Sequence, residues 1–551
     1  MAQRRGHQGA RKCHLVLAAL CVTMSTLGCR SRLAPPPQDA STSCATPTRC
    51  EGTAVRACRD GVLAEVLQEC APDAACSLGR CTSSQCARAE ADPLGLLGCT
   101  FFTFDLDNVD VDDQLGASVL VTNPNQEVAH VALERREAAA WEATARIDVA
   151  PMRSARLALP ELHLEGRGVA SARALRVTSD LPVTAAHVQS DGSGATPVSS
   201  SGATMLLPAH VLGRRYRAIS YREEVTPRLH ETAAEGSHGG AGQIVIVATA
   251  DGTTVDVTPS STATFDVSVP DAGADADAGP SVSNAPMQLV LDEGDYAQLY
   301  GASEGSNLSG TELRANRPIA VFSGNVSTTY GVVATGISSP DLTHEQLLPT
   351  RAWGRRFVGV VLPPQAGVCD PLLTPVGSSK LALVADRDDT NVTIRYAPMT
   401  VVPKTELAAG AWVEETTPRN FTLTASGPVE VMQGMDCEPT MSSAVPTERL
   451  HRDLYFAVLP GFDTTIAIVR REGRATYLDG ARLEDSLFEP VGDGFDVLRV
   501  PLEECPASES VCTHHVQGEF GITMRGMDVL AAWSLTIPTW MPCDPDAAEC
   551  L

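Results

Sequence analysis

Histidine and acidic residues stand together at two places where they could bind a metal ion. His344 and Glu345 begin the spacing of a zinc-protease helix motif, but the second histidine would have to stand at position 348, which is Leu348. The motif needs both histidines because they bind zinc from one face of a helix. His514 and His515 are adjacent, and neighbouring residues of a strand point to opposite faces. We interpret them as an exposed loop pair and predict no metal site at either place.

An aspartate-rich stretch, Asp105–Asp113, is a weak calcium candidate. Its carboxylates recur along the probable end of a strand, and Ca²⁺ prefers oxygen ligands. The stretch lacks the turn glycine and the glutamate at the twelfth position of an EF-hand loop. The alternative is an acidic strand and loop at the entrance of a domain. The candidate ligands are Asp105, Asp107, Asp110 and Asp112.

Motifs of enzymes are not found. The chain has no Gly-x-Ser-x-Gly nucleophile turn and no phosphate loop that ends in Gly-Lys-Ser or Gly-Lys-Thr. We therefore predict no catalytic residues and no cofactor, and a protein that binds rather than catalyses.

Cysteine is abundant, with 17 residues in the chain. So many thiols outside any metal-ligand spacing indicate export to an oxidising compartment. Apart from Cys13, Cys21 and Cys29, all cysteines are disulfide candidates, and their number is even. These are Cys44, Cys50, Cys58, Cys70, Cys76, Cys81, Cys86, Cys99, Cys369, Cys437, Cys505, Cys512, Cys543 and Cys550. The pairing stays open, although we expect the pairs 505 with 512, 543 with 550, and 369 with 437.

The amino terminus has the layout of a secretory signal. Basic residues precede an apolar run from Leu15 to Leu27, which is too short for a membrane span. We expect residues 1–28 to be a signal peptide and Cys29 to receive lipid. Gly28 and Cys29 fit a lipoprotein signal, whereas Leu27 is bulky where a small residue is usual. The expected location is the outer membrane or cell surface, and the alternative is secretion after an ordinary signal peptide.

Two short segments follow the signal. Residues 29–43 contain Pro35, Pro36 and Pro37 and have little to bury, so they predict an extended tether. Residues 44–86 have many cysteines and few aliphatic residues. We predict a small disulfide module there, because such a segment cannot build a core without cross-links. Zinc is the rival interpretation, but the segment has no Cys-x-x-Cys pair.

Residues 97–545 have the texture of an all-β protein. Short runs rich in Val, Ile and Thr alternate with turn residues, as in Gln243–Ala248 and Thr465–Val469. Residues 270–286 interrupt this pattern, and their small and acidic composition predicts a disordered loop insertion. We predict tandem repeated β-sandwich-like domains behind the disulfide module, with an irregular β-propeller as the alternative.

Internal repeats show that one β-unit is used several times, near residues 175–260, 313–396 and 423–530. Leu206–Tyr216 recurs as Leu347–Phe357, and Val247–Val257 recurs as Val384–Ile394. A third motif recurs with a proline near its end, and we expect it to form strand, turn and strand. Its copies are Val177–Val183, Leu313–Ile319 and Leu423–Val429, with a weaker one at Ile522–Val529.

The net charge of −25 argues against nucleic acid as a partner and against adsorption to anionic lipid. The protein part should therefore face solvent. The partners that we expect are a membrane, reached through the lipid anchor, and a glycan or glycoprotein ligand.

Several stretches resemble the amino-terminal domain of the IgG-Fc-binding protein, which also occurs in bacterial surface lipoproteins. The similarity covers most of residues 97–435. It implies an adhesive or binding domain and no known reaction, and it does not imply that this chain binds antibodies. The matching stretches are Gly98–Asn108, Leu175–His187, Ala248–Val257, Leu308–Gly324 and His344–Pro349 with Trp353-Gly354.

The function expected from the sequence is therefore an adhesive or ligand-binding lipoprotein of the cell surface. A structural envelope component that contacts other surface proteins is the second hypothesis. An exported hydrolase is the third.

Overall fold

The computed structural model describes residues 48–59, 62–72, 74–93, 95–106, 116–137, 140–164, 167–191, 200–221, 240–267, 282–303, 306–328, 341–362, 379–398, 400–401, 405–435, 439–506, 508–527 and 532–537. The chain divides into two compact units, Met1–Thr42 and Ser43–Leu551, and these residues belong to the second. The signal, the tether and Cys29 lie outside the described residues. So do Cys44, Cys369, Cys437, Cys543 and Cys550.

The disulfide module consists of short strands and one helix. Its elements are β1 (Thr48–Glu51), β2 (Ala54–Arg59), β3 (Val62–Glu69), β4 (Ala74–Ser77), β5 (Arg80–Ser83) and α1 (Ser84–Glu90). Disulfides join Cys50 to Cys76 and Cys70 to Cys81, and Cys58 is also disulfide-bonded. The disulfide-rich module that the sequence predicts is thus confirmed.

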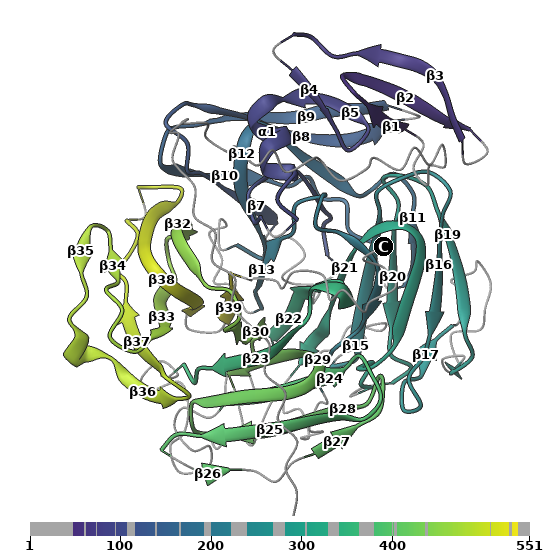
Figure 1. The fold of residues 1–551 in the computed structure, drawn as a ribbon. Helices are drawn as coiled ribbons and strands as arrows, with labels where there is room; N and C mark the ends of the chain where they lie inside the picture. The colour runs from purple at the N-terminus through teal and green to yellow at the C-terminus, as the bar shows by residue number, and fades with distance from the viewer. Residues whose placement is uncertain are drawn as a thin grey trace, which may run out of the picture. The chain divides into compact units, whose positions relative to one another are not determined.

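Four larger sheets follow in chain order (Figure 1). The first has β6 (Gly98–Thr103), β7 (Ala117–Asn123), β8 (Ala129–Glu137), β9 (Ala140–Val149), β10 (Arg153–Ala158), β12 (Leu175–Gln189) and β13 (Gly202–Leu206). The second has β11 (Gly168–Ala170), β14 (Gly213–Arg217), β15 (Gly242–Ala248), β16 (Thr253–Thr258), β19 (Met287–Leu291), β20 (Tyr296–Tyr300), β21 (Glu312–Thr328) and β22 (Asp341–Gln346).

The third sheet has β23 (Gly354–Gly359), β24 (Ser379–Ala385), β25 (Thr390–Tyr396), β26 (Thr400–Val401), β27 (Thr405–Leu407), β28 (Trp412–Thr417), β29 (Phe421–Met435), β30 (Ser442–Ser443) and β31 (Val445–Pro446). The fourth has β32 (His451–Val458), β33 (Asp463–Arg471), β34 (Tyr477–Leu478), β35 (Ala481–Arg482), β36 (Glu489–Gly492), β37 (Phe495–Pro501), β38 (Cys512–Met527) and β39 (Ala532–Thr536). The all-β class is confirmed. In the described residues, no helix is both long and apolar enough to cross a membrane.

Two smaller elements lie beside the second sheet. β17 (Phe265–Asp266) pairs with β18 (Val282–Ser283). Residues 268–281 lie outside the described residues, but 282–286 are described. Val282 and Ser283, which lie within the segment expected to be a disordered loop, therefore belong to a strand pair.

Each sheet contains one long strand that changes its partner halfway. In β12, residues 175–179 pair with β8 and residues 184–189 pair with β7. Pro182 stands at the change, where its missing N–H costs no ladder hydrogen bond. β21 and β29 change partners in the same way beside Pro318 and Pro428. The third repeat motif was expected to be strand, turn and strand, and it is instead this bend inside one continuous strand.

The other two motifs also have structural roles. The Leu206–Tyr216 copy and its repeat lead from the last strand of one sheet into the next sheet, from β13 to β14 and from β22 to β23. The Val247–Val257 copy spans the turn between β15 and β16, where Gly252 has a φ of +64°. The repeats in the sequence therefore correspond to repeats of one sheet and its connections.

The sheets pack on one another in cyclic order. The short strands β13, β22, β30 and β39 contact each other around a ring, with β39 returning to β13. One core cluster joins the first three sheets, a second joins the first to the fourth, and another joins the third to the fourth. This packing agrees with the propeller alternative more closely than with independent sandwich domains.

Candidate ligand-binding cleft

A cleft of about 1150 Å³ lies where the first sheet, the fourth sheet and the module helix α1 meet. Its volume exceeds the range of roughly 300–1,000 Å³ that is usual for small-molecule pockets. The lining is Gln85, Arg88, Ala89, Asp92, Gly95, Leu96, Leu97, Pro124, Asn125, Gln126, Glu127, Pro182, Thr184, Glu448, Arg449, Leu450, His451, Arg452, Asp453, Leu454, Tyr455 and Glu519.

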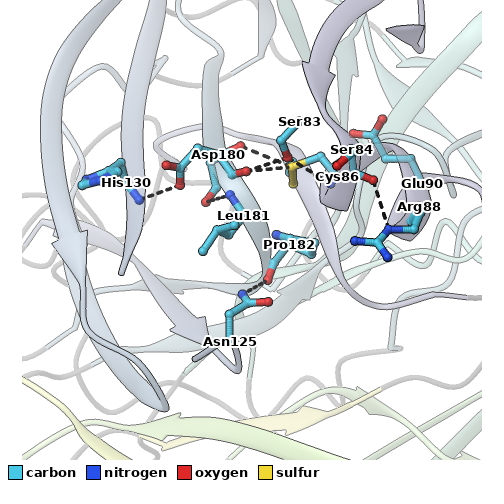
Figure 2. Close-up of a disulfide and its surroundings, with 12 residues drawn as sticks. Ser83, Ser84, Cys86, Arg88, Glu90, Asn125, His130, Asp180, Leu181 and Pro182 are labelled. Carbon is cyan, nitrogen blue, oxygen red and sulfur yellow. Dashed lines mark hydrogen bonds between the residues drawn. A yellow bond between two sulfur atoms is a disulfide. The ribbon is translucent and has the colours of Figure 1, made fainter. Parts of the chain in front are cut away.

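The module helix forms one wall of the cleft and is fixed to the first sheet. Cys86 of α1 forms a disulfide with Cys99 of β6. The Ser83 hydroxyl accepts a hydrogen bond from the Cys86 N–H and donates one to the Asp180 carbonyl at 2.8 Å. Figure 2 shows Ser83, Cys86 and Asp180 side by side. The helix therefore has both a covalent and a hydrogen-bonded connection to the sheet.

The bend in β12 provides these contacts because residues 180–182 do not pair with a neighbouring strand, so their carbonyls can accept other hydrogen bonds. The Asp180 carbonyl accepts from Ser83, while the Asp180 carboxylate accepts from the His130 N–H at 2.8 Å. The Pro182 carbonyl accepts from the Asn125 side-chain amide at 2.8 Å (Figure 2). The bend and the turn after β7 thus hold each other in place at the base of the cleft.

The start of β32 forms the opposite wall. Arg449 Nη2 lies 3.5 Å from Asp92 Oδ2, which follows α1. His451 is half-buried, and its partial loss of hydration lowers its pKa to about 4. Its neutral imidazole donates from Nε2 to the Ile537 carbonyl at 3.1 Å. Both walls are therefore anchored, one by the disulfide and the other by the fourth sheet.

Most acidic side chains of the cleft already have a partner. Asp453 Oδ1 lies 2.6 Å from His515 Nε2, and Glu519 Oε1 lies 3.1 Å from Arg471 Nε. Glu448 Oε1 accepts from the Arg355 N–H at 2.9 Å.

The aromatic group of the cleft is Tyr455. Its ring stacks on the His515 ring, with 3.9 Å between the ring centroids and an interplanar angle of 4°. The two residues pair directly across β32 and β38.

The structure corrects the interpretation of His514 and His515 as a loop pair. Both residues lie in β38. They point to opposite faces, as expected for neighbours in a strand, because His514 stacks on Phe456 and His515 on Tyr455. The sequence did not indicate a strand here because the two adjacent polar histidines interrupt the alternation of apolar and polar residues, which continues after them.

Asp105 is the one calcium candidate that the described residues include, since Asp107, Asp110 and Asp112 lie outside them. It is buried, and burial raises the pKa of its carboxyl. Oδ2 accepts from the N–H groups of Leu162 and His163 at 2.8 and 3.0 Å. Among the described residues, no three His, Cys, Asp or Glu side chains are grouped as a metal site would require.

His344 and Glu345 lie on β22 in the ring of short strands, not on a helix. The His344 ring is buried 5.2 Å from the His187 ring. Glu345 and Glu430 both lie within 3.4 Å of the Ser443 hydroxyl. One hydroxyl proton cannot serve both carboxylates, and burial raises the pKa of each carboxyl to about 8. The carboxyl groups of Glu345 and Glu430 are therefore mostly protonated at neutral pH.

Sequence reasoning did not find the cleft. Its walls come from residues near 88, 125, 182 and 450, which no local pattern connects. The one local signal is the sequence Asn-Pro-Asn at Asn123–Asn125, which is typical of a turn.

The fold and the site thus define an all-β protein of repeated sheets with an open cleft. Residues 202–526 match the family model described as IgGFc binding protein. The match covers more than half of the chain, and the chain belongs to this family. The matched range begins and ends later than residues 97–435, where the sequence resembles the family.

No curated protein matches the chain. A solved structure of a tetra-tandem repeat in the extending region of a large adhesion protein is 10% identical, with 81% of this chain and 99% of that chain covered and a TM-score of 0.09. The pilus adhesin SpaC from Lactobacillus rhamnosus GG is 8% identical, with 77% and 56% covered and a TM-score of 0.08. These scores carry no argument about fold or function.

Proposed function

We propose that this chain is an exported surface protein that binds a segment of a protein or glycoprotein partner in the cleft. Its family is named for binding a protein, and its cysteines and acidic charge suit a folded part that faces solvent outside the cell. The observation that carries the proposal is the cleft itself, which is larger than a small ligand needs and has two anchored walls.

A pair of variants on the module helix tests this proposal. Ala89 lines the cleft and Ala87 of the same helix does not. Ala89→Trp should fill part of the cleft, while Ala87→Trp makes the same change outside it. The wild type and both variants are compared on an array of proteins and glycoproteins. If Ala89→Trp alone loses the array partners that the wild type binds, the result supports the cleft as the binding site. Equal binding by all three proteins contradicts the proposal.

We also propose that Cys29 carries lipid and holds the protein at the outer membrane. The Gly28-Cys29 sequence and the proline-rich residues behind it support this. In a host that processes lipoproteins, the wild type should partition into detergent and give an acylated amino-terminal peptide by mass spectrometry. Cys29→Ser should partition into the aqueous phase. A wild-type amino terminus without lipid contradicts the proposal and favours secretion.

A second function, contact with other envelope proteins, is favoured by β3. This strand pairs with β2 on one edge. Val62, Val66 and Leu67 are each about half exposed on it, and exposed apolar edge strands are typical pairing sites. Replacing Val66 with Lys should abolish such contacts in crosslinking of intact envelopes and leave array binding unchanged. Unchanged crosslinks would contradict this function.

A further inference from the structure

The disulfide module carries a leucine in an unfavourable backbone conformation. Leu78 and Gly79 form the two-residue loop between β4 and β5, and their φ angles are +49° and +73°. In hairpin loops of this kind asparagine or aspartate usually precedes the glycine, because a larger side chain is crowded at positive φ. Leu78 is also 50% exposed. An apolar residue thus stands at a hairpin tip where a polar residue would cost less free energy.

This hairpin tip lies beside the point where the chain enters the module. A Cβ on Gly79 would meet the hydroxyl of Thr48. Thr48 is the first residue of β1 and the first residue that the structure describes. Both strands of the hairpin are held in the module by the two disulfides described above. Leu78 is therefore fixed next to the residues that lead back to Cys29.

The second apolar feature of the module is β3. Its large aliphatic residues are Val62, Leu63, Val66 and Leu67, and none of them belongs to the four hydrophobic clusters that the described residues form. Three of the four are about half exposed, as Leu78 is. Exposed apolar residues that occur together in this way indicate a surface that contacts a protein or a membrane.

The module is nearly neutral, although the chain as a whole is acidic. Residues 44–90 contain five arginines and six aspartates or glutamates, whereas the net charge of the chain is −25. The repulsion that keeps an acidic surface away from anionic lipid is therefore weak for the module. The ionic strength of physiological solutions also screens the charges of the sheets beyond about 8 Å. The module can thus approach a lipid surface at little electrostatic cost.

We infer that the disulfide module rests on the membrane surface, with Leu78 and the exposed side chains of β3 in the headgroup region. This contact goes beyond the proposed binding function, and it rests on the proposed lipid at Cys29, which keeps the module near the membrane. The chain from Cys29 to Thr48 spans at most about 65 Å. At such short range a weak apolar contact is sufficient, because the anchor raises the effective concentration of the lipid surface. The contact fixes the orientation of the tethered protein.

Fluorescence quenching tests whether Leu78 reaches lipid. The full mature chain carries a hexahistidine tag in place of the acylated Cys29 and is held on neutral phosphatidylcholine vesicles by a nickel-chelating lipid. Leu78→Trp adds an emitter at the hairpin tip, and Leu487→Trp adds one at a similarly exposed leucine of η3 (Asp485–Leu487). Brominated acyl chains should quench the emission that Leu78→Trp adds and spare that of Leu487→Trp. No quenching of the first, or equal quenching of both, would overturn the inference.

A change to asparagine separates contact with lipid from a role in folding. Asparagine tolerates positive φ, so Leu78→Asn should unfold at the same temperature as the wild type or at a higher one. When imidazole is added to the vesicles, it should be released about fivefold faster, the change expected for loss of an apolar contact of this size. Leu487→Asn is the control and should be released at the wild-type rate.

Two results of this second experiment would overturn the inference. Release of Leu78→Asn at the wild-type rate would show that the leucine makes no contact with lipid. A lower unfolding temperature would show that the leucine serves the fold.

The proposed functions fail in other ways than this inference does. Because the tag replaces the lipid, an unmodified Cys29 in cells leaves the vesicle results unchanged. Leu78 does not line the cleft, so Leu78→Asn should match the wild type on the array even if the membrane contact is lost. If Val66→Lys abolishes envelope crosslinks and Leu78→Trp is not quenched, the module contacts proteins and not lipid, and the inference is overturned.

Discussion

Asp92 and Arg449 form an ion pair of 3.5 Å that connects the segment after the module helix to the start of the fourth sheet. Other neighbouring sheets are also joined by ion pairs. Arg136 Nη2 of the first sheet lies 2.9 Å from Asp251 Oδ2 of the second, and Arg395 Nη1 of the third lies 3.2 Å from Asp493 Oδ1 of the fourth. Between the fourth sheet and the first, the partner of Arg449 is Asp92, which lies in the segment between α1 and β6.

Asp92→Asn should remove this pair at little cost to folding. Both side chains are more than one-third exposed, and such pairs contribute less than about 1 kcal/mol to the free energy of unfolding. The variant removes one carboxylate and releases the Arg449 guanidinium into the cleft, so it should bind acidic proteins of the array more strongly than the wild type does. The protein and glycoprotein array measures this, with Asp463→Asn of β33 as the control. Weaker binding by Asp92→Asn would show that the pair mainly holds the walls together.

The disulfide between Cys86 and Cys99 should hold the α1 wall of the cleft in place. It should contribute little to the stability of the four large sheets. Replacing both cysteines with serine removes a cross-link over 13 residues, which costs roughly 3 kcal/mol for a loop of this size. We expect faster protease cleavage near α1 and loss of binding on the protein and glycoprotein array, with little change in the unfolding of the sheets.

The matched control for this disulfide is the pair Cys505 and Cys512. The structure joins them across 7 residues, the pairing expected from their short separation, and they do not line the cleft. Serine at both positions should leave cleavage near α1 and binding on the array unchanged. Equal loss of binding in the two double variants would mean that disulfides act through general stability.

The acid pair Glu345 and Glu430 should make stability fall as pH rises. Their pKa values are raised from 4.5 to about 8 in the folded chain. Between these values the unfolded chain binds fewer protons, so the stability contributed by the protonated pair is complete below pH 4.5 and lost as pH rises through about 8. The pKa values of the buried His187 and the half-buried His451 are lowered to about 4. These two histidines oppose this trend only below about pH 6.5.

Glu430→Gln should reduce that loss because glutamine does not ionise. Its Tm should exceed that of the wild type at pH 8.5 by roughly 2–4 °C for each kcal/mol recovered, and by less at pH 5. Glu406→Gln, an exposed change on β27, serves as the control and should follow the wild-type pH profile. Parallel profiles for all three proteins would exclude ionisation of the pair as the cause.

Arg470 should be essential to the fourth sheet. Its side chain is fully buried and its Nε lies 2.9 Å from Asp496 Oδ1. Arg470→Met leaves Asp496 buried without its cation, which should lower the free energy of unfolding by about 3–5 kcal/mol. Arg395→Met removes an exposed pair and should cost about 1 kcal/mol or less. Urea unfolding compares the two, and similar losses would contradict the importance of burial.

The sequence by itself determined the strand content, the repeat and the disulfide module. Alternation of apolar and polar residues acts within one strand, and the repeats are copies of one strand set, so both can be read locally. Leu348 was sufficient to exclude the zinc motif of His344 and Glu345. The family resemblance also came from local motifs, and the match over residues 202–526 confirms it.

Only the tertiary structure decided where the cleft lies and how the sheets pack. Arg88 and Arg452 stand far apart in the chain, and they line one cleft because the fourth sheet packs on the first. Burial likewise made Glu345 a proton-holding acid, although its sequence neighbours give no sign of it. Such properties depend on which surfaces meet and exclude water, and contacts between distant segments are not encoded in the spacing of neighbouring residues.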